Sequence, residues 1–160
     1  MINESDKEKL YNEWHKELGA AQKKFETLDH PWYQSVMKQL PDLNGKRVLE
    51  IGAGRGDFSI WLAQKYKTAE IIGTDFSHSA IEIAKSKIDE SLPNLSFLVE
   101  NAESLSFANE SFDYIISCET MEHVFHPQAM TNEMCRVLKK GAGFILTTEN
   151  YFNAIYLMWI

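Results

Sequence analysis

The fold of this chain is decided by ten consecutive residues, which read Val48-Leu49-Glu50-Ile51-Gly52-Ala53-Gly54-Arg55-Gly56-Asp57. An apolar run passes directly into three glycines at alternate positions, and the residues that follow have helical character. Glycine permits a tight turn and lets the backbone approach a ligand closely. The stretch therefore predicts a strand, a glycine-rich turn and a helix, with a ligand site at the turn.

Strands and helices alternate along the chain beyond this turn. Apolar runs predict strands over 47–51, 70–74, 95–99, 112–117 and 144–148. Helices are predicted over 58–66, 77–91 and 128–139, with Ser77 as an N-cap and Gly141 as the residue that closes the last helix. This order implies β-α-β units. The predicted fold class is α/β, with a Rossmann-like, mainly parallel sheet of about five strands and helices on both faces.

Two further segments flank this region. Residues 4–25 predict an amphipathic helix with an apolar stripe of Leu10, Trp14, Leu18, Ala21 and Phe25. Pro31 suits the first turn of a short second helix. We divide the chain into a helical lid over residues 1–44, a ligand-binding domain over 45–150 and an apolar C-terminal segment over 151–160. The last segment is too short to span a bilayer. It is interpreted as a truncated helix, as a C-terminal helix on the sheet, or as a contact in a homodimer.

Composition excludes several classes of partner. The 160 residues include 16 basic and 23 acidic side chains, which give a net charge of −7 with neutral histidines. Nucleic acids and anionic membranes favour basic surfaces, so neither is expected as the main partner. Cys118 and Cys135 form no C-x-x-C pair and are expected to be buried thiols. The sequence has no leader pattern and no apolar run of transmembrane length, so we expect a cytoplasmic protein without stable membrane insertion.

The glycine turn does not match a dinucleotide site. A dinucleotide fingerprint requires G-x-G-x-x-G, and Asp57 occupies the position three residues after Gly54. A carboxylate at the N-terminus of this helix would repel a pyrophosphate, which otherwise binds there. The G-x-G-x-G spacing beside Glu50 instead favours a nucleoside that carries positive charge and no phosphate.

Several ordered segments resemble the class I S-adenosylmethionine-dependent methyltransferases. The first motif of that family is similar to Glu50-x-Gly52-x-Gly54-x-Gly56, and Asp75 follows Glu50 by 25 residues, at the end of the second strand. Asn101-Ala102-Glu103 follows the third strand, and residues 112–117 and 136–143 resemble the family's fourth-strand motif and the stretch before its fifth strand. The resemblance covers residues 45–150 and is of the small-molecule type, similar to the ubiquinone-pathway O-methyltransferases.

The resemblance implies roles for individual residues in binding S-adenosylmethionine. Gly52, Gly54 and Gly56 would lie under the methionine part of this cofactor. Glu50 would help to hold its ammonium group, directly or through water. Asp75 would accept hydrogen bonds from both ribose hydroxyls.

The adenine would be bound by residues after the second and third strands. By the same resemblance, Phe76 would flank the ring, and Asn101 with the Ala102 backbone would contact its edge. From the residues alone, Phe76 is equally consistent with a core position and Asn101 with a turn at a strand end. Arg55 is expected to be a solvated surface charge.

Three interpretations remain open for the segment that follows the fourth strand. Glu122 and His123 could simply pack this loop over the cofactor. His123 or His126, with Glu122 nearby, could act as general base, because an unperturbed imidazole has a pKa of about 6.5. Glu119, Glu122 and His123 would lie within one turn of a helix and could hold a divalent metal, as in metal-using relatives.

The resulting prediction is an S-adenosylmethionine-dependent methyltransferase that acts on a small-molecule acceptor by in-line transfer. One alternative is a metal-assisted O-methyltransferase, and another is a non-catalytic cofactor-binding or dimerisation module. Family domains continue beyond the fifth strand to an antiparallel pair, for which this chain has no room. We therefore expect a fragment in which cofactor binding survives and turnover is in doubt.

Overall fold

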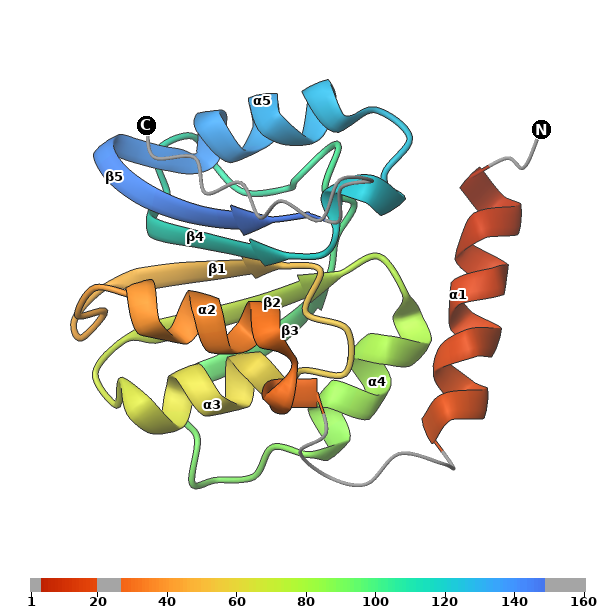
Figure 1. The fold of residues 1–160 in the computed structure, drawn as a ribbon, viewed down its shortest axis with the longest axis horizontal. Helices are drawn as coiled ribbons and strands as arrows, with labels where there is room; N and C mark the ends of the chain where they lie inside the picture. The colour runs from red at the N-terminus through yellow and green to blue at the C-terminus, as the bar shows by residue number, and fades with distance from the viewer. Residues whose placement is uncertain (1–3, 20–26, 149–160) are drawn as a thin grey trace.

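The computed structural model describes residues 4–19 and 27–148. Its centre is a sheet of β1 (Arg47–Ile51), β2 (Glu70–Asp75), β3 (Leu95–Val99), β4 (Phe112–Cys118) and β5 (Leu138–Thr147). The spatial order is β3-β2-β1-β4-β5, and each pair of neighbouring strands is parallel (Figure 1). The order reverses between β1 and β4, and ligands of open parallel sheets bind outside the carboxyl ends of the strands at such a point. The predicted α/β class is confirmed, and the described residues contain the five strands expected.

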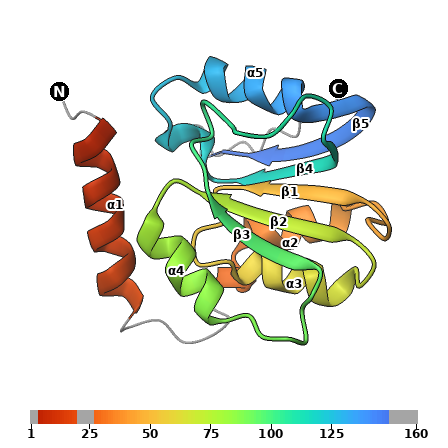
Figure 2. The ribbon, with the colours of Figure 1, turned by 180° about the vertical axis from the view of Figure 1, so that it is seen from behind.

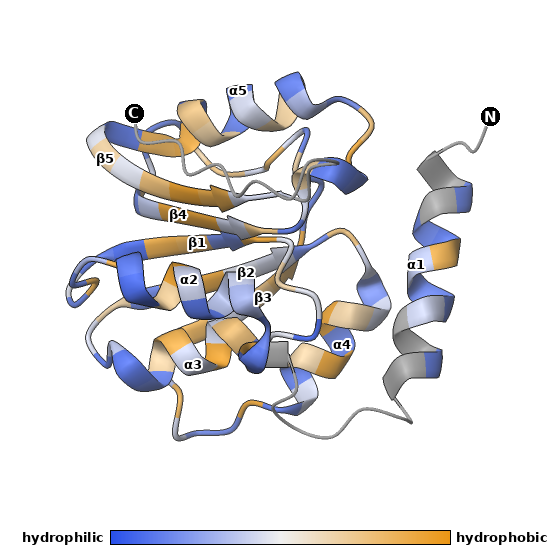
Figure 3. Cartoon of the chain, viewed as in Figure 1, coloured by the Kyte–Doolittle hydropathy of each residue, from blue (hydrophilic) through white to orange (hydrophobic). Residues whose placement is uncertain are grey.

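Helices cover both faces of the sheet. On one face lie α2 (Pro31–Gln39), α3 (Asp57–Lys65) and α4 (His78–Ser86), and on the other lies α5 (Pro127–Val137) (Figures 1 and 2). Successive residues of β1 point to opposite faces, so Val48 joins one apolar cluster and Leu49 the other. Apolar residues accordingly concentrate in the strands and on the sheet-facing sides of the helices (Figure 3). Burial of these two faces is the main force that holds the layers together.

The N-terminal helix α1 (Glu4–Gly19) lies beside α4, on the side toward which the strand arrowheads point (Figures 1 and 2). Two residues of its predicted apolar stripe, Leu10 and Trp14, are 56% and 52% exposed. The helix instead directs Tyr11 and Asn12 toward the start of α4. Ala21 and Phe25 lie outside the described residues. A short 3-10 helix, η1 (Thr27–Asp29), precedes α2.

Two predicted element ends differ from those observed. The last predicted helix ends at Val137, because Leu138 is already extended and pairs with Phe112 of β4. Gly141 therefore lies inside β5 with a φ of 74° and does not cap a helix, which corrects the prediction. Helix α4 stops at Ser86, earlier than predicted, although its N-cap Ser77 is confirmed by a hydrogen bond from Ala80 N–H.

The two cysteines differ in burial, contrary to the expectation that both are buried. Cys118 is buried at the end of β4, whereas Cys135 is exposed on α5. No helix in the described part of the chain is long and apolar enough to cross a bilayer. The apolar segment 151–160, with its predicted truncation and homodimer contact, lies outside the described residues.

Candidate functional site

A cavity of about 690 Å³ lies at the carboxyl ends of the strands, between the sheet and α1. The glycine turn after β1 and the ends of β2 and β3 supply part of its lining. Other parts of the lining come from α1, through Tyr11 and Trp14, from α2, through Trp32 and Tyr33, and from the segment after β4. The cavity thus lies where the topology brings the loops of the sheet together.

The glycine turn is compact because all three glycines adopt a backbone conformation that other residues rarely adopt. Their φ angles are 78° at Gly52, 53° at Gly54 and 79° at Gly56. A Cβ on Gly52 would collide with the side chain of Thr120, and one on Gly56 would collide with the ring of Phe97. Gly52 and Gly54 line the cavity, whereas Gly56 is buried beneath it at the start of α3.

Asp75 connects the end of β2 to the glycine turn. Its Oδ2 accepts a hydrogen bond from Gly54 N–H at 2.9 Å, and its Oδ1 accepts one from Ser77 N–H at 2.9 Å. Burial raises the pKa of this carboxyl, and the backbone donors act in the opposite direction. The carboxylate lines the cavity and is held rigidly, so it is preorganised to accept further hydrogen bonds from a ligand.

Glu50 lies behind the turn and does not line the cavity. Its side chain is buried and accepts a hydrogen bond from Ser59 Oγ of α3. Burial raises the pKa of Glu50 to about 7, and the nearby carboxylates of Asp75 and Asp57 add to the shift. In this position Glu50 can act on a cation in the cavity through its charge and not through direct contact.

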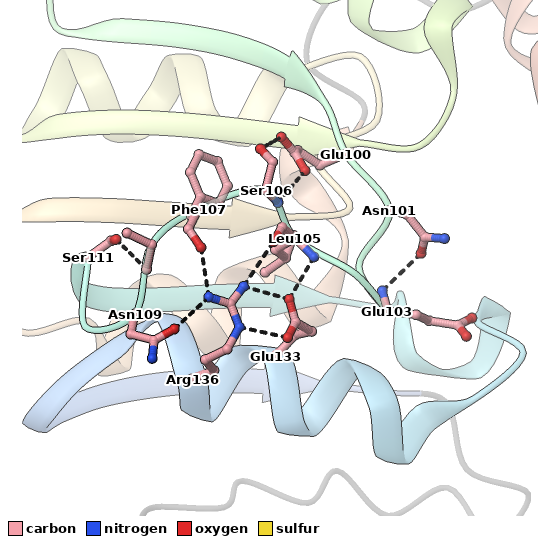
Figure 4. A network of polar contacts seen from close by, with 11 residues as sticks. Glu100, Asn101, Glu103, Leu105, Ser106, Phe107, Asn109, Ser111, Glu133 and Arg136 are labelled. Carbon is pink, nitrogen blue, oxygen red and sulfur yellow. Dashed lines mark hydrogen bonds and ion pairs between the residues drawn. The ribbon is translucent and has the colours of Figure 1, made fainter.

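The residues predicted to contact adenine all line the cavity, namely Phe76, Asn101 and Ala102. Phe76 is half-buried and packs edge-on against Tyr11, with ring centroids 5.1 Å apart. Asn101 Oδ1 accepts a hydrogen bond from Glu103 N–H at 2.9 Å, so this oxygen also shapes the turn after β3 (Figure 4).

Arg136 of α5 holds the segment that follows this turn (Figure 4). Its guanidinium donates to the carbonyls of Leu105 and Phe107 at 2.9 and 2.7 Å, and forms an ion pair with Glu133 at 2.7 Å. Glu133 Oε2 also accepts a hydrogen bond from Leu105 N–H at 2.7 Å. These contacts anchor the chain beyond Asn101 to α5, a link that the sequence motif around Arg136 did not reveal.

The segment after β4 forms a single 3-10 turn, η2 (Met121–His123), and not the α-helix required for the predicted metal ligands. Glu119 and His123 line the cavity, but the carboxylate of Glu122 accepts a hydrogen bond from Thr148 Oγ1 at 2.9 Å and is not part of the lining. Across residues 4–19 and 27–148, no group of three His, Cys, Asp or Glu side chains is placed to hold a metal ion. The three candidate ligands therefore do not converge.

The two histidines of this segment have different surroundings. His123 lines the cavity, and its ring lies 5.8 Å from that of Tyr11. His126 is not part of the lining, and its Nδ1 contacts Glu103 Oε2 at 2.7 Å, which joins the loops after β3 and β4. Of the two candidate bases, only His123 faces the cavity.

The cavity lining is rich in negative charge. Arg55, which was expected to be a solvated charge, is half-buried and lines the cavity. Among the described residues, the lining also contains six carboxylates. They belong to Glu8, Asp57, Asp75, Glu100, Glu103 and Glu119. Such a lining favours a ligand with positive charge.

Sequence comparison identifies the family. The profile of a family described as "Methyltransferase domain" matches residues 42–156 of the chain. The chain belongs to this methyltransferase family. The resemblance that the motifs indicated, to class I S-adenosylmethionine-dependent methyltransferases, is confirmed.

Two curated relatives of the methyltransferase domain have a quinone in their names. A demethylmenaquinone methyltransferase of Lactococcus lactis is 33% identical over 116 residues, which cover 71% of this chain and 46% of the relative. A ubiquinone biosynthesis O-methyltransferase of Coxiella burnetii is 32% identical over 133 residues, which cover 83% of this chain and 56% of the relative. The chain thus spans about half the length of these relatives.

A solved structure supports the fold of the methyltransferase domain. The S-adenosylmethionine-dependent methyltransferase of Aquifex aeolicus superposes with a TM-score of 0.67 at 20% identity, over 81% of this chain and 74% of that one. The family cofactor, S-adenosylmethionine, has a cationic sulfur and carries no phosphate. The cavity fits this group, because it combines the glycine backbone at Gly54 and the fixed carboxylate of Asp75 with an acidic lining.

Proposed function

We propose that this domain transfers the methyl group of S-adenosylmethionine to a small-molecule acceptor. The observation that carries the proposal is the hydrogen bond between Asp75 and Gly54, which joins the ends of β1 and β2 inside an acidic cavity. Asp75 would hold the ribose, while Gly52 and Gly54 would lie under the methionine part. Phe76, Asn101 and Ala102 would enclose the adenine.

When bound, S-adenosylmethionine supplies a methyl group on a positively charged sulfur, which needs no further activation. The chain therefore contributes by orienting the reactants and excluding water, which in favourable cases lowers a barrier by ~7–11 kcal/mol. Tyr11, Trp32 and Tyr33 line the cavity and would exclude water from it. The surrounding carboxylates would favour the cationic ligand.

A general base is needed only when the acceptor is a poor nucleophile such as a hydroxyl group. His123 is the candidate, because it faces the cavity and imidazole is the side chain that most often serves as a general base. Glu122 would act indirectly, since its hydrogen bond to Thr148 fastens η2, the turn that carries His123.

The proposal is tested in two stages with the purified chain. Calorimetric titration with S-adenosylhomocysteine should show saturable binding at one site. Incubation with radiolabelled S-adenosylmethionine and a panel of small phenols, quinols and amines should then show transfer to at least one class of acceptor. Absence of binding would contradict the proposal. Binding without transfer to any acceptor would favour the non-catalytic cofactor-binding module.

A further inference from the structure

A polar contact fastens α1 to the start of α4. Asn12 Oδ1 accepts hydrogen bonds from Ser77 Oγ–H at 2.7 Å and from Ser79 N–H at 3.1 Å. Ser79 lies in the first turn of α4, where backbone N–H groups have no partner within the helix. Asn12 therefore completes the N-terminal cap of α4 from another element, together with the cap that Ser77 itself provides.

The residues that Asn12 contacts belong to the turn that shapes the candidate site. Ser77 N–H donates to Asp75 Oδ1, so Asn12 is separated from the Asp75 carboxylate by one residue. The neighbour of Asn12 on α1, Tyr11, packs against Phe76 at 5.1 Å and against His123 at 5.8 Å between ring centroids. Through these two adjacent residues, α1 contacts the walls that β2 and η2 contribute to the cavity.

An ion pair and two apolar side chains of α1 add less to its attachment. Glu8 and His78 approach to only 4.0 Å with exposed side chains, and exposed ion pairs contribute little. Leu10 and Trp14 remain more than half exposed, so they bury little apolar surface. Asn12 and Tyr11 therefore make a direct contribution to the attachment of α1 beside the cavity.

We infer that Asn12 is a positioning residue, which holds α1 over the cavity and thereby slows the release of the bound nucleoside. The inference rests on the proposed function, because it assumes that the cavity binds S-adenosylmethionine and its product. Tyr11 supplies the surface that covers the ligand. The hydrogen bonds of Asn12 fix α1, and so fix the position of Tyr11. Asn12 touches neither ligand nor reacting atoms, so its effect is on binding and release.

The test compares release of S-adenosylhomocysteine from the wild-type chain and from variants at Asn12, by stopped-flow displacement and calorimetry. Loss of two hydrogen bonds in Asn12→Ala should speed dissociation about tenfold, with a matching rise in Kd. Asn12→Asp retains an oxygen that accepts both hydrogen bonds, so it should restore release to within about twofold of wild type. Glu13→Ala, an exposed position on the same helix, serves as the control and should leave release unchanged.

A second measurement reports on α1 without any ligand. Trypsin should cleave Asn12→Ala after Lys9 of α1 faster than it cleaves the wild type, because α1 separates more often from the start of α4. Alanine is a better helix former than asparagine, so the substitution does not weaken the helix itself. Equal cleavage in the two proteins would contradict the inference.

The outcomes separate the inference from the proposed function. If the wild-type chain does not bind S-adenosylhomocysteine, the proposed function fails. If it binds, but Asn12→Ala releases the ligand within twofold of the wild-type rate, the inference is overturned. It is also overturned if Asn12→Asp is as impaired as Asn12→Ala, because the effect would then not come from the oxygen that accepts the two hydrogen bonds.

Discussion

At the scale of single residues, Glu50 places a carboxylate where the fold would otherwise bury an apolar side chain. Its pKa rises from an ordinary 4.5 to about 7, because burial disfavours the charged form. The folded chain therefore binds a proton that the unfolded chain has released between these two values. Stability from this proton is fully present below pH 4.5 and is lost as the pH rises through 7.

This linkage predicts the behaviour of Glu50→Gln. The substitution keeps the volume of the side chain and an oxygen that accepts the hydrogen bond from Ser59. Position 50 should then no longer contribute to the pH dependence of the free energy of unfolding between pH 5 and 8. Relative to wild type, the variant should gain up to about 3 kcal/mol at pH 8 and little at pH 5. Urea unfolding at both pH values measures the difference. Parallel pH profiles for the two proteins would contradict the assignment of this proton to Glu50.

Asp75 is predicted to act on the ligand more than on the fold. In Asp75→Asn the amide can no longer accept hydrogen bonds through both oxygens, so affinity for S-adenosylhomocysteine should fall about tenfold or more. Asp113→Asn is the matched control, because Asp113 also accepts a backbone N–H, from Arg47, but at the opposite end of the strands. The control should bind as wild type does. An equal loss of affinity in the two variants would indicate that both substitutions act by destabilising the fold.

At the scale of elements, the glycine turn depends on both conformation and space. Gly45 and Gly52 have similar φ angles of 71° and 78°, but a Cβ meets nothing within 4 Å at Gly45 and collides with Thr120 at Gly52. Gly45→Ala should therefore lower the free energy of unfolding by about 1–2 kcal/mol, from backbone strain alone. Gly52→Ala should lower it by about 3 kcal/mol or more, because the overlap with Thr120 adds to the backbone strain. Urea unfolding tests both, and equal losses would show that Thr120 moves aside freely.

The elements themselves were largely predictable from periodicity, and the exceptions have local causes. The strands are short apolar runs between polar turns, so the sequence locates most of them within a residue or two. The sequence does not locate the start of β5, because Lys139, Lys140 and Gly141 have no apolar pattern. These residues belong to the strand because Leu138, just before them, pairs with Phe112 of β4. Likewise the spacing of Glu119 and His123 suggested a helix, but Glu119 adopts a φ of 50° and only one 3-10 turn forms.

At the scale of the whole molecule, the sequence indicated several residues of the strand ends that line the cavity, but not the contacts that α1 makes there. Asp75 and Gly54 belong to one β-α-β unit, and the parallel topology brings their strand ends together. Asn12 contacts Ser77 across a sequence separation of 65 residues, and a lone asparagine on a helix gives no signal of such a contact. The path of α1 across the sheet edge depends on tertiary packing, which hydrophobic periodicity does not report.

The distribution of charge over the molecule leads to a prediction about ligand preference. The net charge is −7, and six carboxylates among residues 4–19 and 27–148 line the cavity, so the field there favours cations. S-adenosylmethionine carries one more positive charge than S-adenosylhomocysteine, and its binding should therefore respond more strongly to salt. Raising ionic strength from about 0.01 M to 1 M shortens the Debye length from about 30 to 3 Å, so the ratio of the two Kd values should shift about threefold against the cation. Calorimetry with both ligands measures this ratio of Kd values. A ratio that does not change with salt would contradict the prediction. It would mean that nearby cations neutralise the carboxylates, as Lys87 does when it pairs with Asp57 at 2.7 Å.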